Sequence, residues 1–322
     1  MKPLAHLLAA GLLACLAVPA SAADNWPSKS VRVIVPSSPG GGTDLYARLL
    51  TQQLADILGQ PFVVDNRPGA SGLIGADAVA RSAPDGYTIL VASNSSITIS
   101  PGLYDNLSFD AAKDFTPIAR GVMAPMVLVV NAQEPYQELE QLLQAGKDRP
   151  DELFYGSAGV ASAPYLGVRM MEEGTEMRFN HVPYKGVGPG IQDLVAGRLQ
   201  FMMPDLAAVR GFVADGRLRP LALNQSSELL PNVKTFKELG VDNMDAVVSF
   251  SVLGPAGMPP AIVDKLSAAV NEAMRQPAMA ERLKELVLVP VFDTPAEFEQ
   301  SLRAERELWA DFIQRNNITP DQ

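Results

Sequence analysis

One stretch near the start of the chain decides the fold: Val31-Arg32-Val33-Ile34-Val35-Pro36-Ser37-Ser38-Pro39-Gly40-Gly41-Gly42-Thr43-Asp44. Its first five residues are mostly β-branched and predict a short strand, which Pro36 ends. Apolar residues then recur at helical spacing over residues 45–58, and Gly59 follows as a stop signal. The order of strand, glycine-rich loop and helix is typical of the opening of an α/β domain.

The same alternation of strand and helix continues along the chain. Strands at 62–65 and 87–91 and a helix around 74–79 complete a β-α-β-α-β pattern, which predicts a parallel sheet covered by helices. Further strands are predicted at 126–130, 153–155, 179–182, 199–203, 218–222 and 246–253, with helices at 136–147, 164–173, 189–196, 260–275 and from 295 onward.

No linker separates the two α/β units, so we expect them to exchange strands, crossing at about residues 125 and 249. This arrangement predicts a two-lobed clamshell with two strand crossovers. The first lobe comprises residues 23–124 and 250–322, and the second lobe comprises residues 125–249.

Residues 1–22 have the pattern of a signal peptide that is removed. Lys2 supplies a positive charge, residues 4–18 are almost wholly apolar, and Ala20-Ser21-Ala22 forms a small-residue cleavage site. The apolar stretch is too short for a membrane span, so we expect a secreted protein. Cys15 follows Leu-Leu-Ala, which leaves lipid anchoring at this residue as the alternative.

The composition of the mature chain excludes most catalytic classes. Cleavage removes Lys2, His6 and Cys15, so the 26 basic side chains become 25 against 36 acidic ones, and the formal charge changes from −10 to −11. A cysteine nucleophile, a disulfide and a thiolate or multi-histidine metal site are thereby impossible, and no G-x-S-x-G motif is present. We predict no catalytic residue, metal or cofactor. The acidic balance also argues against nucleic acid as a partner.

Ligands of open α/β sheets bind beyond the carboxyl ends of the strands, so the loops that follow strands are the candidate sites. In the glycine loop, small residues let a ligand approach the backbone, and the helix N-terminus favours an anion such as a carboxylate. The candidates in this loop are Ser38, Gly40, Gly41, Gly42, Thr43 and Asp44. The alternative is a tight turn in which Asp44 only caps the helix.

Four other segments offer polar groups after predicted strands: Ser93-Asn94-Ser95, Ser157-Ala158-Gly159 with Ser162, Tyr184-Lys185, and Asp205. Each also has a plain structural interpretation. The serine loops can be solvated, Lys185 can face water, Asp205 can cap a helix, and His181 can be a structural core residue.

Five motifs occur in order: Pro39-Gly40-Gly41-Gly42-Thr43-Asp44, Asn66-Arg67-Pro68-Gly69-Ala70, Pro84-Asp85-Gly86-Tyr87-Thr88, His181-Val182-Pro183-Tyr184-Lys185-Gly186 and Arg217-Leu218-Arg219-Pro220-Leu221-Ala222. With them, essentially the whole mature chain resembles the TctC or Bug family, the receptors of tripartite tricarboxylate transporters. The resemblance implies a type II periplasmic binding protein, or Venus flytrap, that closes on a small carboxylated solute. One carboxylate would be held by backbone amides and ordered waters at residues 40–43.

The resemblance also implies partners and a compartment. We expect a monomer in the periplasm that delivers a di- or tricarboxylate, an amino acid or an aromatic acid to a tripartite tricarboxylate-type permease in the membrane. A receptor that presents its ligand to a sensor kinase, and a secreted enzyme, are the alternatives. Three regions depart from the family pattern, namely Ser37-Ser38, Ile97 and Tyr165-Leu166 with Arg169. They predict a site that is less polar around the distal end of the ligand or that accepts an aromatic ligand.

Overall fold

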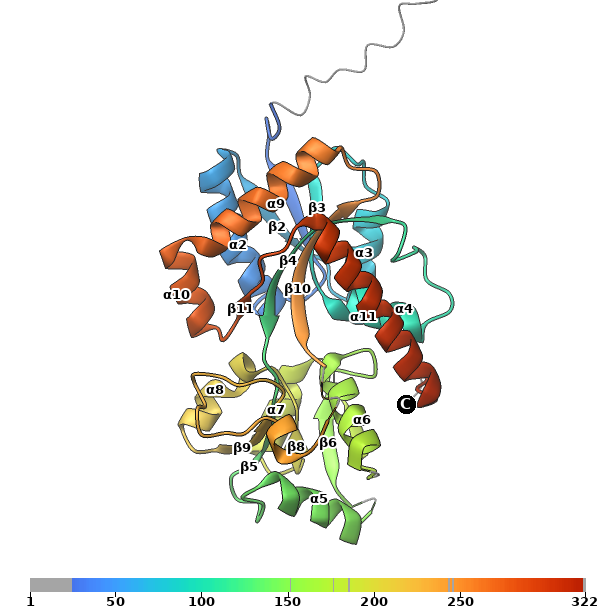
Figure 1. Ribbon diagram of the computed structural model, residues 1–322, viewed down its shortest axis with the longest axis vertical. Helices are drawn as coiled ribbons and strands as arrows, with labels where there is room; N and C mark the ends of the chain where they lie inside the picture. The colour runs from blue at the N-terminus through green and yellow to red at the C-terminus, as the bar shows by residue number, and fades with distance from the viewer. Residues whose placement is uncertain are drawn as a thin grey trace, which may run out of the picture.

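The computed structural model describes residues 25–150, 152–175, 177–184, 186–242, 244 and 246–320. The predicted signal peptide and Cys15 lie outside these residues. The described chain forms two mixed β-sheets, each covered by helices, in two lobes stacked one above the other (Figure 1). No helix in the described ranges is both long enough and apolar enough to cross a membrane.

The first lobe contains the six-stranded sheet, in the order β11-β4-β10-β3-β1-β2. Its strands are β1 (Val31–Val35), β2 (Phe62–Asn66), β3 (Thr88–Ser93), β4 (Phe115–Ala124), β10 (Val248–Pro255) and β11 (Val289–Pro290). Its helices are α2 (Gly42–Leu58), α3 (Leu73–Ala80), α4 (Ser100–Leu103), α9 (Pro260–Arg275), α10 (Pro277–Glu285) and α11 (Pro295–Arg315), with short helical turns η1 (Ala70–Gly72) and η2 (Ser95–Ile99).

The second lobe contains the five-stranded sheet, in the order β7-β6-β8-β5-β9. Its strands are β5 (Val127–Asn131), β6 (Phe154–Ser157), β7 (Asn180–Pro183), β8 (Phe201–Met202) and β9 (Leu218–Leu223). Its helices are α5 (Leu139–Asp148), α6 (Ala163–Thr175), α7 (Val187–Val195), α8 (Leu206–Ala214) and the short η3 (Lys237–Leu239).

The two strands that enter a sheet from the opposite lobe run against their neighbours. β10 is antiparallel to β3 and β4, and β5 is antiparallel to β8 and β9. Apart from β11, which is antiparallel to β4, the other strands of each lobe run toward the hinge, whereas an arriving strand starts there and runs away from it. The predicted α/β clamshell with two crossovers is thus confirmed, but the expectation of parallel sheets holds only for neighbours such as β1, β2 and β3.

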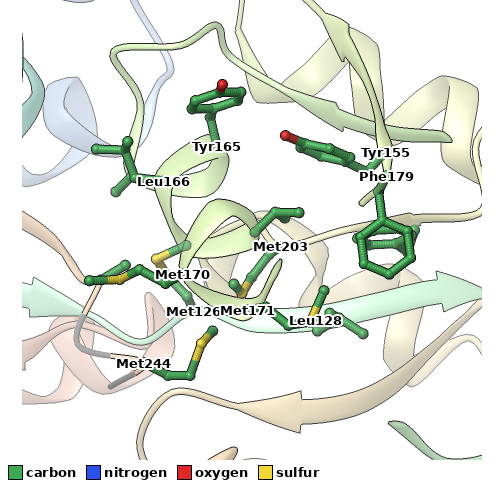
Figure 2. Packing of buried hydrophobic residues seen from close by; sticks show 14 of the residues in the cluster. Met126, Leu128, Tyr155, Tyr165, Leu166, Met170, Met171, Phe179, Met203 and Met244 are labelled. Atoms are coloured by element: carbon green, nitrogen blue, oxygen red, sulfur yellow. The ribbon is translucent and has the colours of Figure 1, made fainter. Parts of the chain in front are cut away.

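Apolar burial explains why these segments form strands. β5 is buried along its whole length, as expected for a strand covered on both faces. In the largest core of the second lobe, methionines from separate segments converge with Tyr155 and Phe179 (Figure 2). Methionine side chains fill irregular spaces well because they are unbranched and flexible. Those methionines are Met126, Met170, Met171, Met203 and Met244.

Two elements of the first lobe position the glycine loop. Phe250 of β10 is 5% exposed and stacks on Tyr46 of α2, with ring centroids 6.1 Å apart. A Cβ placed on Gly42 would lie 3.0 Å from the Phe250 ring. The start of α2 therefore rests directly on this ring, and only glycine fits there without a shift of the ring.

We expect Phe250→Ala to lower the free energy of unfolding by about 3–5 kcal/mol, because it removes a buried aromatic side chain and leaves a cavity under α2. Urea unfolding followed by circular dichroism measures this loss, and Phe250→Leu, which keeps most of the apolar volume, is the matched control. A loss of less than about 1 kcal/mol for the alanine variant would contradict the packing described.

Candidate functional site

The glycine loop leaves the carboxyl end of β1 and leads into an uncapped helix. Gly41 is the N-cap residue of α2 with extended backbone angles, and no side chain caps the helix. Gly40, Gly41 and Gly42 are all exposed, and Gly40 adopts a φ of +83°, which favours glycine. Gly42 thus lies exposed at the positive end of the helix dipole, which is a suitable place for an anion, whereas Thr43 is buried and the N–H groups of Gly40 and Gly41 already donate to Asp44 and to the Ser38 carbonyl.

Asp44 lies beneath this loop and holds it in place. Its side chain is buried, and its carboxylate accepts hydrogen bonds from the Gly40 N–H, from Arg48 Nε and from Asn66 Nδ2, each at 2.9 Å. Asn66 also donates to the carbonyl oxygen of Ser37 at 3.0 Å. Asp44 therefore does not cap α2, as the alternative supposed; it holds the loop from below and joins it to the end of β2.

The surroundings of Asp44 favour its charged form. Burial alone would raise the pKa of this carboxyl, but the hydrogen bonds from Arg48, Gly40 and Asn66 and the charge of Arg48 outweigh burial and lower it. A carboxyl whose pKa is lower in the folded state stabilises the fold above its unfolded pKa. That stabilisation is lost as the pH falls through the lower, folded pKa.

A second loop beside the glycine loop carries unusual backbone angles that the sequence did not reveal. Residues 69–72 all have positive φ, including Ala70 at +46° and Ser71 at +53°, and the Gly72 N–H donates to the Gly69 carbonyl at 2.9 Å. A Cβ on Gly72 would meet both Pro36 and Ser96, so this loop lies between the loops after β1 and β3. Non-glycine residues with positive φ concentrate at functional sites. The Arg-Pro-Gly-Ala-Ser-Gly sequence at 67–72, with its proline and two glycines, was the feature from which a tight loop at this place could have been predicted.

The third loop of the first lobe contains Asn94, whose amide is already engaged. Asn94 is 4% exposed, and its Nδ2 donates to the Val247 carbonyl and to Glu305 Oε1, both at 2.8 Å. The flanking Ser93 and Ser95 are half-buried. Asn94 thus ties this loop to β10 and α11. Among the described residues, the Ser93 and Ser95 hydroxyl groups make no hydrogen bond of this kind.

The second-lobe candidates gather around the ends of β6 and β7. Ser157 pairs in register with Pro183, and its Oγ lies 2.7 Å from His181 Nε2 and accepts the Gly159 N–H at 3.1 Å. Ser162 Oγ donates to the Gly159 carbonyl at 2.6 Å. Ala158 and Gly159 are half-buried and Ser157 is fully buried, so the loop presents backbone more than the Ser157 hydroxyl.

His181 supports this loop from within the lobe. Its ring contacts Tyr155 and Tyr165, with centroids 5.1 and 4.7 Å away, and its Nδ1 is buried without a hydrogen-bond partner in the described residues. Burial, reinforced by the positive charge of Arg169, lowers the pKa of His181 to about 4. His181 is therefore neutral at physiological pH.

The remaining candidates take structural positions. The Tyr184 hydroxyl donates to Asp193 Oδ2 at 2.8 Å, and burial together with this bond raises the pKa of Tyr184 to about 12. Asp205 is half-buried and caps α8 by accepting the Ala208 N–H at 2.9 Å, and burial raises its pKa. It lies next to the first crossing, where the Leu206 N–H donates to the Pro125 carbonyl. Lys185 lies outside the described residues.

The described part of the chain holds no group of three or more His, Cys, Asp or Glu side chains that could bind a metal ion. The candidate site consists of two groups of loops, one in each lobe. The loops after β1, β2 and β3 pack together in the first lobe, and the loops after β6 and β7 pack together in the second.

Comparison with known proteins shows the family to which this chain belongs. The model of the TctC family, the tripartite tricarboxylate transporter family receptors, matches residues 46–318. The chain belongs to this family. This chain is also 35% identical to protein BugT of Bordetella pertussis over 301 residues, which cover 92% of either chain.

Solved structures of TctC-like proteins agree with the fold. Rpa4515 of R. palustris, solved with adipate, has a TM-score of 0.85 and 31% identity, covering 92% of this chain and 99% of that one. MatC (Rpa3494) from Rhodopseudomonas palustris, with bound malate, has a TM-score of 0.81 and 30% identity, covering 89% and 99%. The chain is therefore a periplasmic solute-binding protein and not an enzyme, so the alternative of a secreted enzyme is wrong.

We expect Asp44→Asn to destabilise the protein by about 1–3 kcal/mol at pH 7, because it leaves Arg48 without its buried partner. The difference from wild type should shrink as the pH falls below the ordinary value of 3.8, where the wild-type carboxyl also becomes protonated. Urea unfolding of both proteins between pH 3 and 7 measures this. A difference that does not depend on pH would show that the charge of Asp44 is not what stabilises the loop.

We expect the His181 ring to remain neutral between pH 5 and 8, with a titration midpoint near 4 instead of near 6.5. His181 is the only histidine after residue 22, so in protein that begins at residue 23 its ring signals in an NMR titration need no further assignment. Because the unfolded state takes up the proton first, this residue should reduce stability as the pH falls from about 6.5 toward 4. A midpoint at 6 or above would contradict the buried position.

Proposed function

We propose that the protein captures a small carboxylated solute between its two lobes and delivers it to a membrane permease of the tripartite tricarboxylate type. One carboxylate of the solute binds at the glycine loop, against the N–H groups at the start of α2. The loop after β6, with Ala158, Gly159 and Ser162, meets the other end of the solute. The observation that carries this proposal is the uncapped and exposed start of α2.

The cations near the glycine loop support recognition by the backbone. Arg48 is bound to Asp44 at 2.9 Å, and Arg67 is bound to Asp65 at 3.1 Å. Each of these arginines thus already faces a carboxylate of the protein itself. A solute carboxylate at the glycine loop therefore relies on peptide N–H groups and the helix dipole.

The overall charge favours the same local mechanism. The mature chain carries a formal charge of −11, after loss of Lys2 from the whole-chain value of −10, so its general field repels anions. A site that binds carboxylates on this protein must act at short range. The ligands named for two related structures, adipate and malate, are both dicarboxylates, which makes dicarboxylates the first class to test.

A thermal-shift screen of purified mature protein against dicarboxylates, tricarboxylates, amino acids and aromatic acids tests this function. A solute present at 100 times its dissociation constant stabilises the folded state by about 2.7 kcal/mol. We expect a clear rise in Tm with at least one carboxylate and none with its amide or ester. A shift produced equally by the amide would contradict recognition of the carboxylate.

We expect Gly41→Val to abolish this binding while the fold is retained. Gly41 has φ −74° and ψ 163°, which valine adopts readily, and the nearest atom to an added Cβ is the Ser38 carbonyl oxygen at 3.4 Å. The branched side chain would cover the first-turn N–H groups. Isothermal titration with the best carboxylate of the screen measures the loss.

The matched control is Gly211→Val on α8, where an added Cβ would meet nothing within 4 Å. This variant should bind like wild type. If Gly41→Val also binds like wild type while its Tm is unchanged, the glycine loop is not the carboxylate site.

A further inference from the structure

Helix α11 extends from the first lobe down to the second (Figure 1). Its first half belongs to a core of the first lobe, since Phe298 and Leu302 pack in the cluster that contains Ile34, Leu90 and Leu253. A capping box between Thr294 and Glu297 fixes its start. This end of the helix is therefore anchored on the six-stranded sheet.

The second half of α11 belongs to a buried cluster that both lobes share. Trp309, Phe312 and Ile313 are at most 5% exposed and belong to the same cluster as Leu128, Leu166 and Phe201. The η2–α4 segment of the first lobe contributes Ile99 and Leu103 to that cluster. Burial of large side chains of this kind is worth several kcal/mol in total.

An ion pair reinforces this second anchor. Arg315 Nε and Nη2 donate to the two carboxylate oxygens of Glu173 on α6, at 3.0 and 3.2 Å, and Asn316 Nδ2 donates to the same carboxylate at 3.3 Å. The Arg–Glu contact is bidentate, which fixes its geometry better than a single bond does.

The middle of α11 is tied to the second crossing. Glu305 Oε1 accepts from Asn94 Nδ2 at 2.8 Å, and the same nitrogen donates to the Val247 carbonyl at 2.8 Å. Val247 lies on the segment through which the chain returns from the second lobe to β10. Asn94 therefore connects the loop after β3, the crossing and α11 at one buried point.

The opposite flank of the hinge is held more loosely. There, Lys284 of α10 contacts Glu228 of the second lobe at 3.0 Å, but both side chains are more than 70% exposed. A groove of about 300 Å³ runs beside this ion pair, lined by residues that include Pro125, Leu229, Val289 and Pro290. An exposed ion pair contributes little energy, and Val287, which follows α10, is the one buried side chain of this segment in the second-lobe cluster of Leu206 and Leu223. These contacts are fewer than those of α11, so this flank opens at the lower cost.

We propose that α11 is a strap that fastens the two lobes together on one flank of the hinge, so that they rotate about this flank while the α10 flank opens and closes. The strap is held by Trp309, Phe312 and the Arg315–Glu173 pair in the second lobe and by the Asn94–Glu305 contact at the crossing. This role does not depend on which solute the protein binds.

Double electron–electron resonance on the mature protein, without added solute, tests the strap. The mature chain has no cysteine, so engineered cysteines can be spin-labelled selectively. Labels at Asp56 on α2 and Lys147 on α5 report the separation of the lobes. Labels at Lys147 and Gln314 report whether the end of α11 follows the second lobe, and a pair at Lys147 and Asp215 reports on the second lobe itself; all four positions are exposed.

In the combined variant Phe312→Ala with Glu173→Lys, we expect the Asp56–Lys147 and Lys147–Gln314 distance distributions to broaden and shift, while the Lys147–Asp215 pair stays unchanged. Phe179→Ala is the matched control, because it removes a buried ring of the same core that packs on Phe201 and leaves α11 intact. In this control the separation of the lobes should be that of wild type.

The proposal is overturned if the Asp56–Lys147 distribution keeps its wild-type width in the combined variant, or if Phe179→Ala broadens it equally. Should the alanine variant fail to fold, Phe312→Leu with Glu173→Lys keeps most of the apolar volume and weakens the same anchor. Its lobe distribution must then broaden relative to that of Phe312→Leu alone, and an unchanged width refutes the strap.

Discussion

The rest of the structure depends on the two places where the chain passes between lobes. Each crossing delivers a strand into the middle of the opposite sheet, where β10 pairs with β3 and β4 and β5 pairs with β8 and β9. Neither sheet can be completed without chain from beyond its own lobe. The same constraint places the carboxyl ends of the parallel strands, and hence the loops that follow them, on the hinge side of each sheet.

The two loop groups of the proposed anion site are held in shape in different ways. In the first lobe an aspartate shapes the backbone: the Asp44 carboxylate binds Gly40, Arg48 and Asn66, and no side chain caps the start of α2. In the second lobe a neutral histidine and buried serines hold the loop without any net charge.

Much of the fold could be predicted from the sequence because strand and helix periodicities are local. The helix that ends at Leu58 and the capped helix from Pro295 both appear where their patterns place them. β4 was not predicted because it contains Pro117 and Gly121, residue types that are uncommon inside a regular strand. In the structure Gly121 adopts a φ of +76°, which is also not typical of a strand. The antiparallel direction of β10 follows from a long-range crossing that no local pattern records.

The candidate site was predictable in its loops but not in its side chains. The rule that ligands bind after strands identified the glycine loop, the Ser93–Ser95 loop and the 157–162 loop. This rule could not predict where a side chain points, because its hydrogen-bond partners lie far away in the sequence. Asn94 bonds to Val247 and Glu305, and Ser157 bonds to His181. The division into residues 23–124 with 250–322 and 125–249 remains a prediction, and residues 309–318 pack with the second lobe despite their place in it.

That packing also affects the order in which the protein can fold. The strands of the second lobe end with β9 at Leu223, yet the buried cluster to which they contribute also includes Trp309, Phe312, Ile313 and Ile318, which are synthesised much later. While the chain is emerging, the second lobe has its own strands but an unfilled core, so its native state forms only after most of the first lobe's second segment has been made. Contacts so distant in sequence slow folding. For a chain with the export signal predicted at residues 1–22, this delay favours passage across the membrane in the unfolded form, before the last helix completes the shared cluster.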